Sequence, residues 1–149
     1  NAGLADVFLR KFDSDGNVAW TAQIGTDAWD RCDSIAVDAS GNAYVSGYTQ
    51  GNLGGANVGG EDAFMSKLDS DGNVLWTTQI GTGDDDYSHS VAVDTVGNVY
   101  IGGTTWGDLD GDNAGSPDAF LVKHEVPEPA TLGILTLSGL AFFPRRRKT

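Results

Sequence analysis

Three carboxylates at alternating positions, in the segment Asp108-Leu-Asp110-Gly-Asp112-Asn113, have the residue types and spacing best suited to bind a metal ion. Carboxylate oxygens are preferred ligands of Ca²⁺, and alternate spacing lets them converge from one loop. An EF-hand loop that began at Asp108 would need a bidentate acidic residue at its twelfth position, which is Ala119. Asp108, Asp110 and Asp112 are therefore candidate calcium ligands, and the favoured alternative is an acidic surface link. We expect no other cofactor.

Two serines, a histidine and three aspartates also lie close together, in the segment 84–90. A hydrolytic triad is assembled from separate elements of a fold, whereas these residues share one loop and the strand expected after it. We therefore predict no hydrolase site, and the chain is not expected to be an enzyme.

The pattern Asp-x-x-Gly-Asn occurs four times, each time after a run of β-forming residues and before Val or Ala. An aspartate at the start of a turn can accept a hydrogen bond from the backbone two residues on, and glycine readily adopts the left-handed conformation. These segments are expected to be hairpin turns, and their structural residues are Asp13, Gly16, Asn17, Asp38, Gly41, Asn42, Asp69, Gly72, Asn73, Asp94, Gly97 and Asn98. The extra carboxylates Asp15 and Asp71 occur only in the first turn of each pair, where a solvated loop is favoured over calcium binding.

The turns belong to a longer internal repeat. Residues 6–61 align with residues 62–117 without a gap, with 30 identities in 56 positions, and the segment 118–124 begins a third unit. Trp20 recurs as Trp76 and is expected in the core, whereas Trp29 and Trp106 do not recur and could make surface contacts, for example with carbohydrate. Gly47 and Gly103 are expected to allow the close approach of a neighbouring sheet.

Each repeat contains four short β-patterned segments. In the first repeat they are 7–12, expected to be buried on both faces, then 18–24, which alternates between apolar and polar residues, then 35–38 and 43–49. Four antiparallel strands per unit predict an all-β fold of β-propeller blades, namely blades 6–61 and 62–117 and a stub at 118–124, all within residues 1–125. A stacked β-solenoid is the alternative. Because propellers use about four to eight blades, two blades cannot close a ring. We therefore expect the chain to be the C-terminal end of a longer protein, or to complete its ring by association.

The surface charge excludes one class of partner. The formal net charge is −12, although four of the nine basic residues lie at the C-terminal end. Since a negative surface repels phosphate backbones, we expect no nucleic-acid partner. Cys32 is the single cysteine and cannot form an internal disulfide.

The tail, residues 126–149, has a different composition. A Pro-Glu-Pro segment (Pro127, Glu128 and Pro129) precedes an apolar stretch at 130–144 and a basic tail at 145–149, which contains Arg145, Arg146, Arg147 and Lys148. A helix of about 16 residues would span about 24 Å, which is short against a hydrocarbon core of roughly 30 Å. We expect a short hydrophobic helix in the membrane with its basic end in the cytoplasm, and a buried or interfacial helix is the alternative.

Two family resemblances follow from these motifs. The unit Asp-Ala-Phe-x-x-Lys-x-Asp-x-x-Gly-Asn-x-x-Trp, followed by Gln-Ile-Gly and Ser-Val-Ala-Val-Asp-x-x-Gly-Asn-x-Tyr, resembles the bacterial SBBP repeat. That resemblance covers residues 6–124 and implies a β-propeller repeat of exported proteins, without a shared catalytic motif. The tail resembles the PEP-CTERM sorting signal. This second resemblance implies a Gram-negative bacterium, export, removal of the tail by an exosortase, and a link to exopolysaccharide and biofilm matrix.

Together these observations predict an exported, non-enzymatic repeat protein of the cell surface or extracellular matrix. It would be anchored in the membrane until the exosortase cleaves it, and its propeller would contact exopolysaccharide or surface proteins. The alternative is a C-terminal piece of a larger exported enzyme whose catalytic residues lie upstream.

Overall fold

The computed structural model describes residues 2–115 and 117–125, and these residues form an all-β fold, as predicted. The tail expected to carry the hydrophobic helix, residues 126–149, lies outside them. No helix long and apolar enough to cross a membrane occurs within the described ranges. The strands are β1 (Val7–Phe12), β2 (Val18–Ile24), β3 (Asp30–Val37), β4 (Ala43–Thr49), β5 (Asp62–Leu68), β6 (Val74–Ile80), β7 (Asp86–Val93), β8 (Val99–Thr105) and β9 (Asp118–His124).

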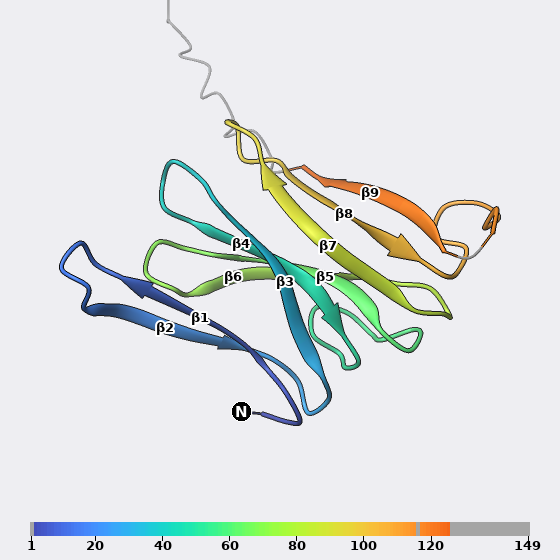
Figure 1. Cartoon of the computed structure of the whole chain (residues 1–149), viewed down its shortest axis with the longest axis horizontal. Coiled ribbons are helices and arrows are strands. Elements are labelled where there is room, and N and C mark those ends of the chain that lie inside the picture. Colours follow the sequence, from blue (N-terminus) through green and yellow to red (C-terminus); the bar gives the residue numbers. More distant parts are fainter. Residues whose placement is uncertain (1, 116, 126–149) are drawn as a thin grey trace, which may run out of the picture.

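The strands form three antiparallel sheets, and the second sheet lies between the first and the third (Figure 1). The first sheet is β1-β2, the second is β3-β4-β5-β6, and the third is β7-β8-β9. The four-stranded sheet runs from residue 30 to residue 80, across the boundary at 61/62 that was expected to separate two blades. The sheets are therefore offset by half a repeat from the expected units 6–61 and 62–117, and the expected stub is the third strand of the third sheet. A tandem repeat shows its period but not its starting point, so the sequence did not reveal this offset.

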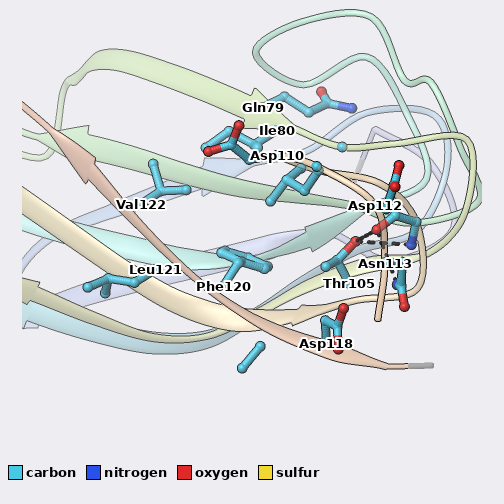
Figure 2. Close-up of a pocket in the computed structure, with 15 residues that line it drawn as sticks. Gln79, Ile80, Thr105, Asp110, Asp112, Asn113, Asp118, Phe120, Leu121 and Val122 are labelled. Atoms are coloured by element: carbon cyan, nitrogen blue, oxygen red, sulfur yellow. Dashed lines mark hydrogen bonds between the residues drawn. The ribbon is translucent and has the colours of Figure 1, made fainter. Parts of the chain in front are cut away.

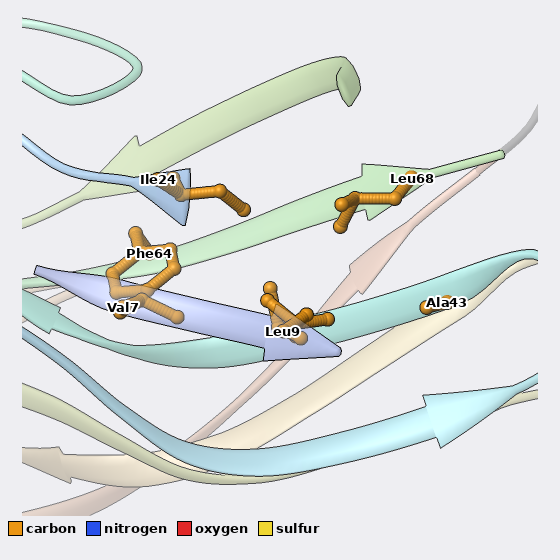
Figure 3. Close-up of a cluster of buried hydrophobic side chains, with 7 residues drawn as sticks. Val7, Leu9, Ile24, Ala43, Phe64 and Leu68 are labelled. Carbon is orange, nitrogen blue, oxygen red and sulfur yellow. The ribbon is translucent and has the colours of Figure 1, made fainter. Parts of the chain in front are cut away.

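Each face of the second sheet packs against a neighbouring sheet. On one face, Val7, Leu9 and Ile24 of the first sheet pack on four residues of the second, Ala43, Val45, Phe64 and Leu68 (Figure 3). On the other face, Tyr44 and Met65 pack on Val99 and Ile101 of the third sheet. The two faces receive alternate residues of β4 because side chains alternate along a strand.

Equivalent residues differ in burial according to what covers them. Phe64 in β5 is 0% exposed, whereas its repeat equivalent Phe8 in β1 is 71% exposed. The expectation that the first strand of each repeat is buried on both faces is correct for β5 and wrong for β1. The reason is that the first sheet covers one face of β5, while no sheet among the described residues covers the equivalent face of β1.

The four Asp-x-x-Gly-Asn segments connect the paired strands as tight turns. In the turn between β5 and β6, the Gly72 amide donates to the Asp69 carbonyl at 3.1 Å, and the Asp69 amide donates to the Asn73 carbonyl at 2.9 Å. The Asp69 side chain also accepts from the Asn73 amide at 2.8 Å. Glycine is needed at the fourth position because its φ angle is positive, from +81° at Gly41 to +96° at Gly97.

One of these turns also forms part of the contact between sheets. The indole Nε1 of Trp20, in the first sheet, donates to the Ser70 carbonyl at 2.9 Å. The Lys11 ammonium donates to the same carbonyl at 3.1 Å. A Cβ atom added at Gly72 would lie 2.6 Å from the Trp20 ring. The turn of one sheet is therefore a docking point for the recurring tryptophan of the sheet before it.

The close approach at Gly47 and Gly103 occurs within a sheet, contrary to the expectation of a neighbouring sheet. A Cβ at Gly47 would collide with the carbonyl of Arg31 on β3, and a Cβ at Gly103 with the carbonyl of Tyr87 on β7. Both glycines lie beside a shift in strand register, between Cys32 and Ser34 and between Ser88 and Ser90. The bulge brings the adjacent strand close, so glycine is required there.

Candidate binding cleft

The second and third sheets pack against each other along β3, β4 and β7, and one end of this contact lies where β3 and β7 begin and where β4 and β8 end. The Val91 amide of β7 donates to the Ser34 hydroxyl of β3 at 3.1 Å, and the Asp86 amide donates to the Glu61 carbonyl at 2.6 Å. At this end the two sheets form an open cleft of about 550 Å³, lined by Arg31, Asp33, Tyr48, Tyr87, His89, Thr104 and Trp106. A smaller hollow of about 240 Å³ adjoins it, shares Arg31 and Tyr48, and is also lined by Trp29, Gln50 and Glu61.

Two buried carboxylates fix the loops that lead into the cleft. Asp30 is 3% exposed and accepts from the Thr26 amide at 2.6 Å. Asp86 is 0% exposed and accepts from the Thr82 amide at 2.6 Å. Because these carboxylates hold the chain just before β3 and β7, the side chains that follow them have defined positions in the cleft.

Aromatic rings form a continuous row across the cleft. The rings of Tyr48 and Tyr87 lie 4.8 Å apart at 87°, and those of Tyr87 and Trp106 lie 5.4 Å apart at 81°. Such edge-to-face contacts hold neighbouring rings in fixed orientations. Trp106 nevertheless remains 41% exposed, and Trp29 in the adjoining hollow is 53% exposed. The Trp106 ring is therefore held in place and left accessible, and Trp29 adds exposed apolar surface in the adjoining hollow.

Polar groups stand beside these rings. The Arg31 guanidinium donates through Nε to the Asp33 carboxylate at 2.9 Å, and its Cζ lies 5.8 Å from the centre of the Tyr48 ring. The His89 Nε2 and the Thr104 hydroxyl are 3.0 Å apart. The cleft thus combines a cation, a carboxylate, an imidazole and hydroxyl groups with stacking surfaces.

Two groups in the cleft have shifted pKa values. Burial, together with the negative charges of Glu61 and Asp85, raises the pKa of the Tyr87 phenol to about 12. Its hydroxyl donates to the Glu61 carboxylate at 3.3 Å and remains protonated at neutral pH. The hydrogen bond to Tyr48 and the charge of Asp33 raise the pKa of the Arg31 guanidinium above its usual value. Both groups are therefore hydrogen-bond donors at neutral pH.

The internal repeat separates what the fold requires from what the cleft adds. The framework residues Asp30, Ser34 and Thr49 are identical to their equivalents 56 positions later. In contrast, four pairs of equivalent positions at the cleft all differ, namely Arg31/Tyr87, Asp33/His89, Tyr48/Thr104 and Gln50/Trp106. The two repeats therefore have the same residues at these framework positions and different residues at the positions that line the cleft. The cleft residues are therefore not needed to form the sheets.

The structure does not assemble the expected calcium ligands into a cation site. Asp110, Asp112 and Asp118 line an open hollow beside β9 (Figure 2). The Asp108 carboxylate accepts from the Asn113 amide at 2.7 Å. Within residues 2–115 and 117–125, no three His, Cys, Asp or Glu side chains are grouped so that they could hold a metal ion. Among the described residues, β9 has no neighbouring strand equivalent to β6, which pairs with β5 in the second sheet.

The remaining candidate residues have separate positions. Within the 84–90 segment, Asp86 and Ser88 are buried, whereas His89 is exposed and contacts Thr104. The residues expected to form the sorting signal lie outside the described ranges. Trp29 and Trp106 could be predicted as surface contacts from the sequence, whereas the charged and tyrosine side chains beside them were not predicted. Differences between the aligned repeats were the signal that could have found these residues.

Comparison with known proteins agrees with this architecture. The family model of the SBBP β-propeller repeat matches residues 19–54 and 75–110. The chain is a β-propeller repeat protein. Each matched segment of this repeat protein begins within the second strand of an aligned unit, β2 or β6, and ends just beyond the fourth, β4 or β8.

Two relatives are similar to most of this chain. The regulatory protein FlaEY of Caulobacter vibrioides is 31% identical over 132 residues, which cover 80% of this chain. An uncharacterized WD repeat-containing protein of Acanthamoeba polyphaga mimivirus is 27% identical over 143 residues, which cover 78% of this chain. The match spans 14% of the first relative and 10% of the second, so both are far longer than this repeat region.

Proposed function

We propose that this chain is a non-catalytic β-propeller binding module of an exported protein, which contacts proteins or polysaccharides at the cell surface or in the extracellular matrix. The observation that carries the binding role is the convergence of exposed aromatic and charged side chains at positions where the two repeats differ. A fixed aromatic row beside hydrogen-bonding groups is typical of binding sites. The recurring residues of the same strands instead have structural roles.

The proposed export and processing are supported by the order of motifs in the tail. Pro127, Glu128 and Pro129 precede an uncharged segment and a cluster of four basic residues. An apolar segment followed by basic residues is typical of a membrane anchor whose end stays in the cytoplasm. We propose that the tail holds the precursor in the membrane until an exosortase cleaves near the Pro-Glu-Pro segment, which would release the repeats outside the cell.

Replacement of Pro127, Glu128 and Pro129 by alanine tests this processing in a Gram-negative host that produces an exosortase. We expect an uncleaved precursor in the membrane fraction, detected by intact mass and by a C-terminal epitope. A control with the flanking residues Glu125 and Thr131 replaced by alanine should be cleaved normally. Normal cleavage of the triple variant would contradict the proposed sorting signal.

A larger exported enzyme is the second candidate. The matched relatives are about seven to ten times longer than the region they share with this chain, by the 14% and 10% coverage, so proteins with such a region have room for further domains. In that case the repeats would be an accessory module of the enzyme. Sequencing the complete reading frame distinguishes the two. Further repeats with a signal peptide favour the binding module, and a separate domain with a convergent polar site favours the enzyme.

A further inference from the structure

We propose that the cleft between the second and third sheets, with its adjoining hollow, binds a neutral oligosaccharide that stacks on Trp106 and Trp29. This inference rests on the proposed binding function and names its ligand class. A pyranose ring presents C–H groups on its face and hydroxyl groups around its edge. It therefore needs a flat apolar surface with hydrogen-bonding groups beside that surface.

The aromatic residues provide such surfaces at both ends of the site. Trp106 and Trp29 are 41% and 53% exposed, respectively. They line two hollows that share Arg31 and Tyr48, so one extended ligand can contact both. The contact with Tyr87 fixes the Trp106 ring at 5.4 Å and 81°. A ring that is already held in place loses little conformational entropy when it stacks on a ligand.

The polar residues suit hydroxyl groups, which both donate and accept hydrogen bonds. Arg31 is a donor, and the Asp33 carboxylate 2.9 Å from it is an acceptor, so the pair can contact two neighbouring hydroxyls. The imidazole of His89, which lies parallel to the Tyr87 ring with 6.3 Å between the ring centres, adds a third polar group.

The charges around the site disfavour an anionic ligand. Asp33, Asp85 and Glu61 surround the aromatic row, which disfavours phosphorylated, sulfated and uronic-acid chains. The exposed rings and the paired donor and acceptor groups, rather than charge, favour a saccharide over a peptide. The main cleft, of about 550 Å³, falls within the range of small-ligand sites, about 300–1,000 Å³.

Trp106→Gln is the decisive variant, because glutamine occupies the equivalent position, Gln50, in the other repeat. The fold therefore already accepts this side chain at this site. Trp29→Asp follows the same logic, since Asp85 is its equivalent. The matched control is Leu121→Met, which exchanges a 75% exposed residue outside the cleft for its equivalent, Met65.

The experiment measures binding of the full chain to arrays of neutral glucans, mannans, galactans and N-acetylated glycans, with anionic glycans and peptides on the same arrays. Titration calorimetry then gives the affinity for the best neutral glycan. We expect at least a tenfold loss of affinity in Trp106→Gln and in Trp29→Asp, no loss in Leu121→Met, and unchanged thermal midpoints in all three.

Binding to peptides alone, to anionic glycans alone, or to no glycan would overturn the saccharide inference. So would neutral-glycan binding that survives Trp106→Gln. Peptide binding that Trp106→Gln abolishes would leave the proposed binding function intact. Unchanged binding of every ligand in Trp106→Gln and Trp29→Asp would instead remove the cleft as the basis of that function.

Discussion

Substitution of Gly72 by alanine tests whether the Asp-x-x-Gly-Asn turn holds two sheets together. The matched control is Gly16→Ala, because Gly16 occupies the same place in an identical turn, with φ of +82° against +86° at Gly72. A Cβ at position 16 would meet nothing within 4 Å, whereas one at position 72 would lie 2.6 Å from the Trp20 ring. Only the second substitution perturbs the contact between sheets.

The expected energies follow from this difference. Both variants force alanine into the left-handed conformation, at a cost of about 1–2 kcal/mol. Carbon atoms in contact prefer roughly 3.5–4.0 Å, so alanine at position 72 must displace the indole by about 1 Å. That displacement breaks the hydrogen bond from Trp20 Nε1 to the Ser70 carbonyl, now 2.9 Å, which contributes about 1 kcal/mol. With lost packing, Gly72→Ala should destabilise the protein by about 1–3 kcal/mol more than Gly16→Ala.

Urea unfolding followed by tryptophan fluorescence and by far-UV circular dichroism measures both free energies. In a Trp20→Ala background there is no indole left to displace, so Gly16→Ala and Gly72→Ala should lower the free energy of unfolding by equal amounts. The docking role of this turn is refuted if, in the protein that retains Trp20, Gly72→Ala and Gly16→Ala lower the free energy of unfolding by amounts that agree within about 0.5 kcal/mol.

Two further predictions concern individual ionisable groups. Hydrogen bonds from the side chain and backbone of Asn73 hold the pKa of Asp69 below its usual value. A lowered pKa in the folded state stabilises the protein above the unfolded value of about 3.9 and ceases to do so as the pH falls through the folded value. Asp69→Asn should therefore lower the thermal midpoint at pH 7, and its midpoint should fall less between pH 4 and pH 2 than that of the unsubstituted protein. Asp71→Asn should behave like the unsubstituted protein. If the midpoint falls by the same amount between pH 4 and pH 2 in all three proteins, this prediction is wrong. Burial raises the pKa of the Cys32 thiol, so iodoacetamide at pH 8 should alkylate it more slowly in the folded protein than in 8 M urea, and equal rates would show that the thiol is accessible.

The turns and the strand class could be predicted from the sequence because they depend on neighbouring residues. Asp, Gly and Asn at fixed offsets determine a turn within five residues, and alternating apolar residues indicate a strand with one buried face. The recurrence of Trp20 as Trp76 likewise identified the residues that pack between sheets, since both pack against core clusters. The proposed sorting signal also rests on local order alone, in the tail that follows the repeats.

The composition of each sheet and the cleft depended on tertiary structure. A repeat of 56 residues is equally self-similar from any starting point, so only the pairing of β4 with β5 showed that the second sheet begins at Asp30. Arg31, Tyr48, Tyr87 and Trp106 are separated by up to 75 positions in the chain and meet because strand register and sheet packing align their ends. Local patterns specify the backbone conformation over a few residues, whereas the cleft arises from contacts between two sheets, which no short segment encodes.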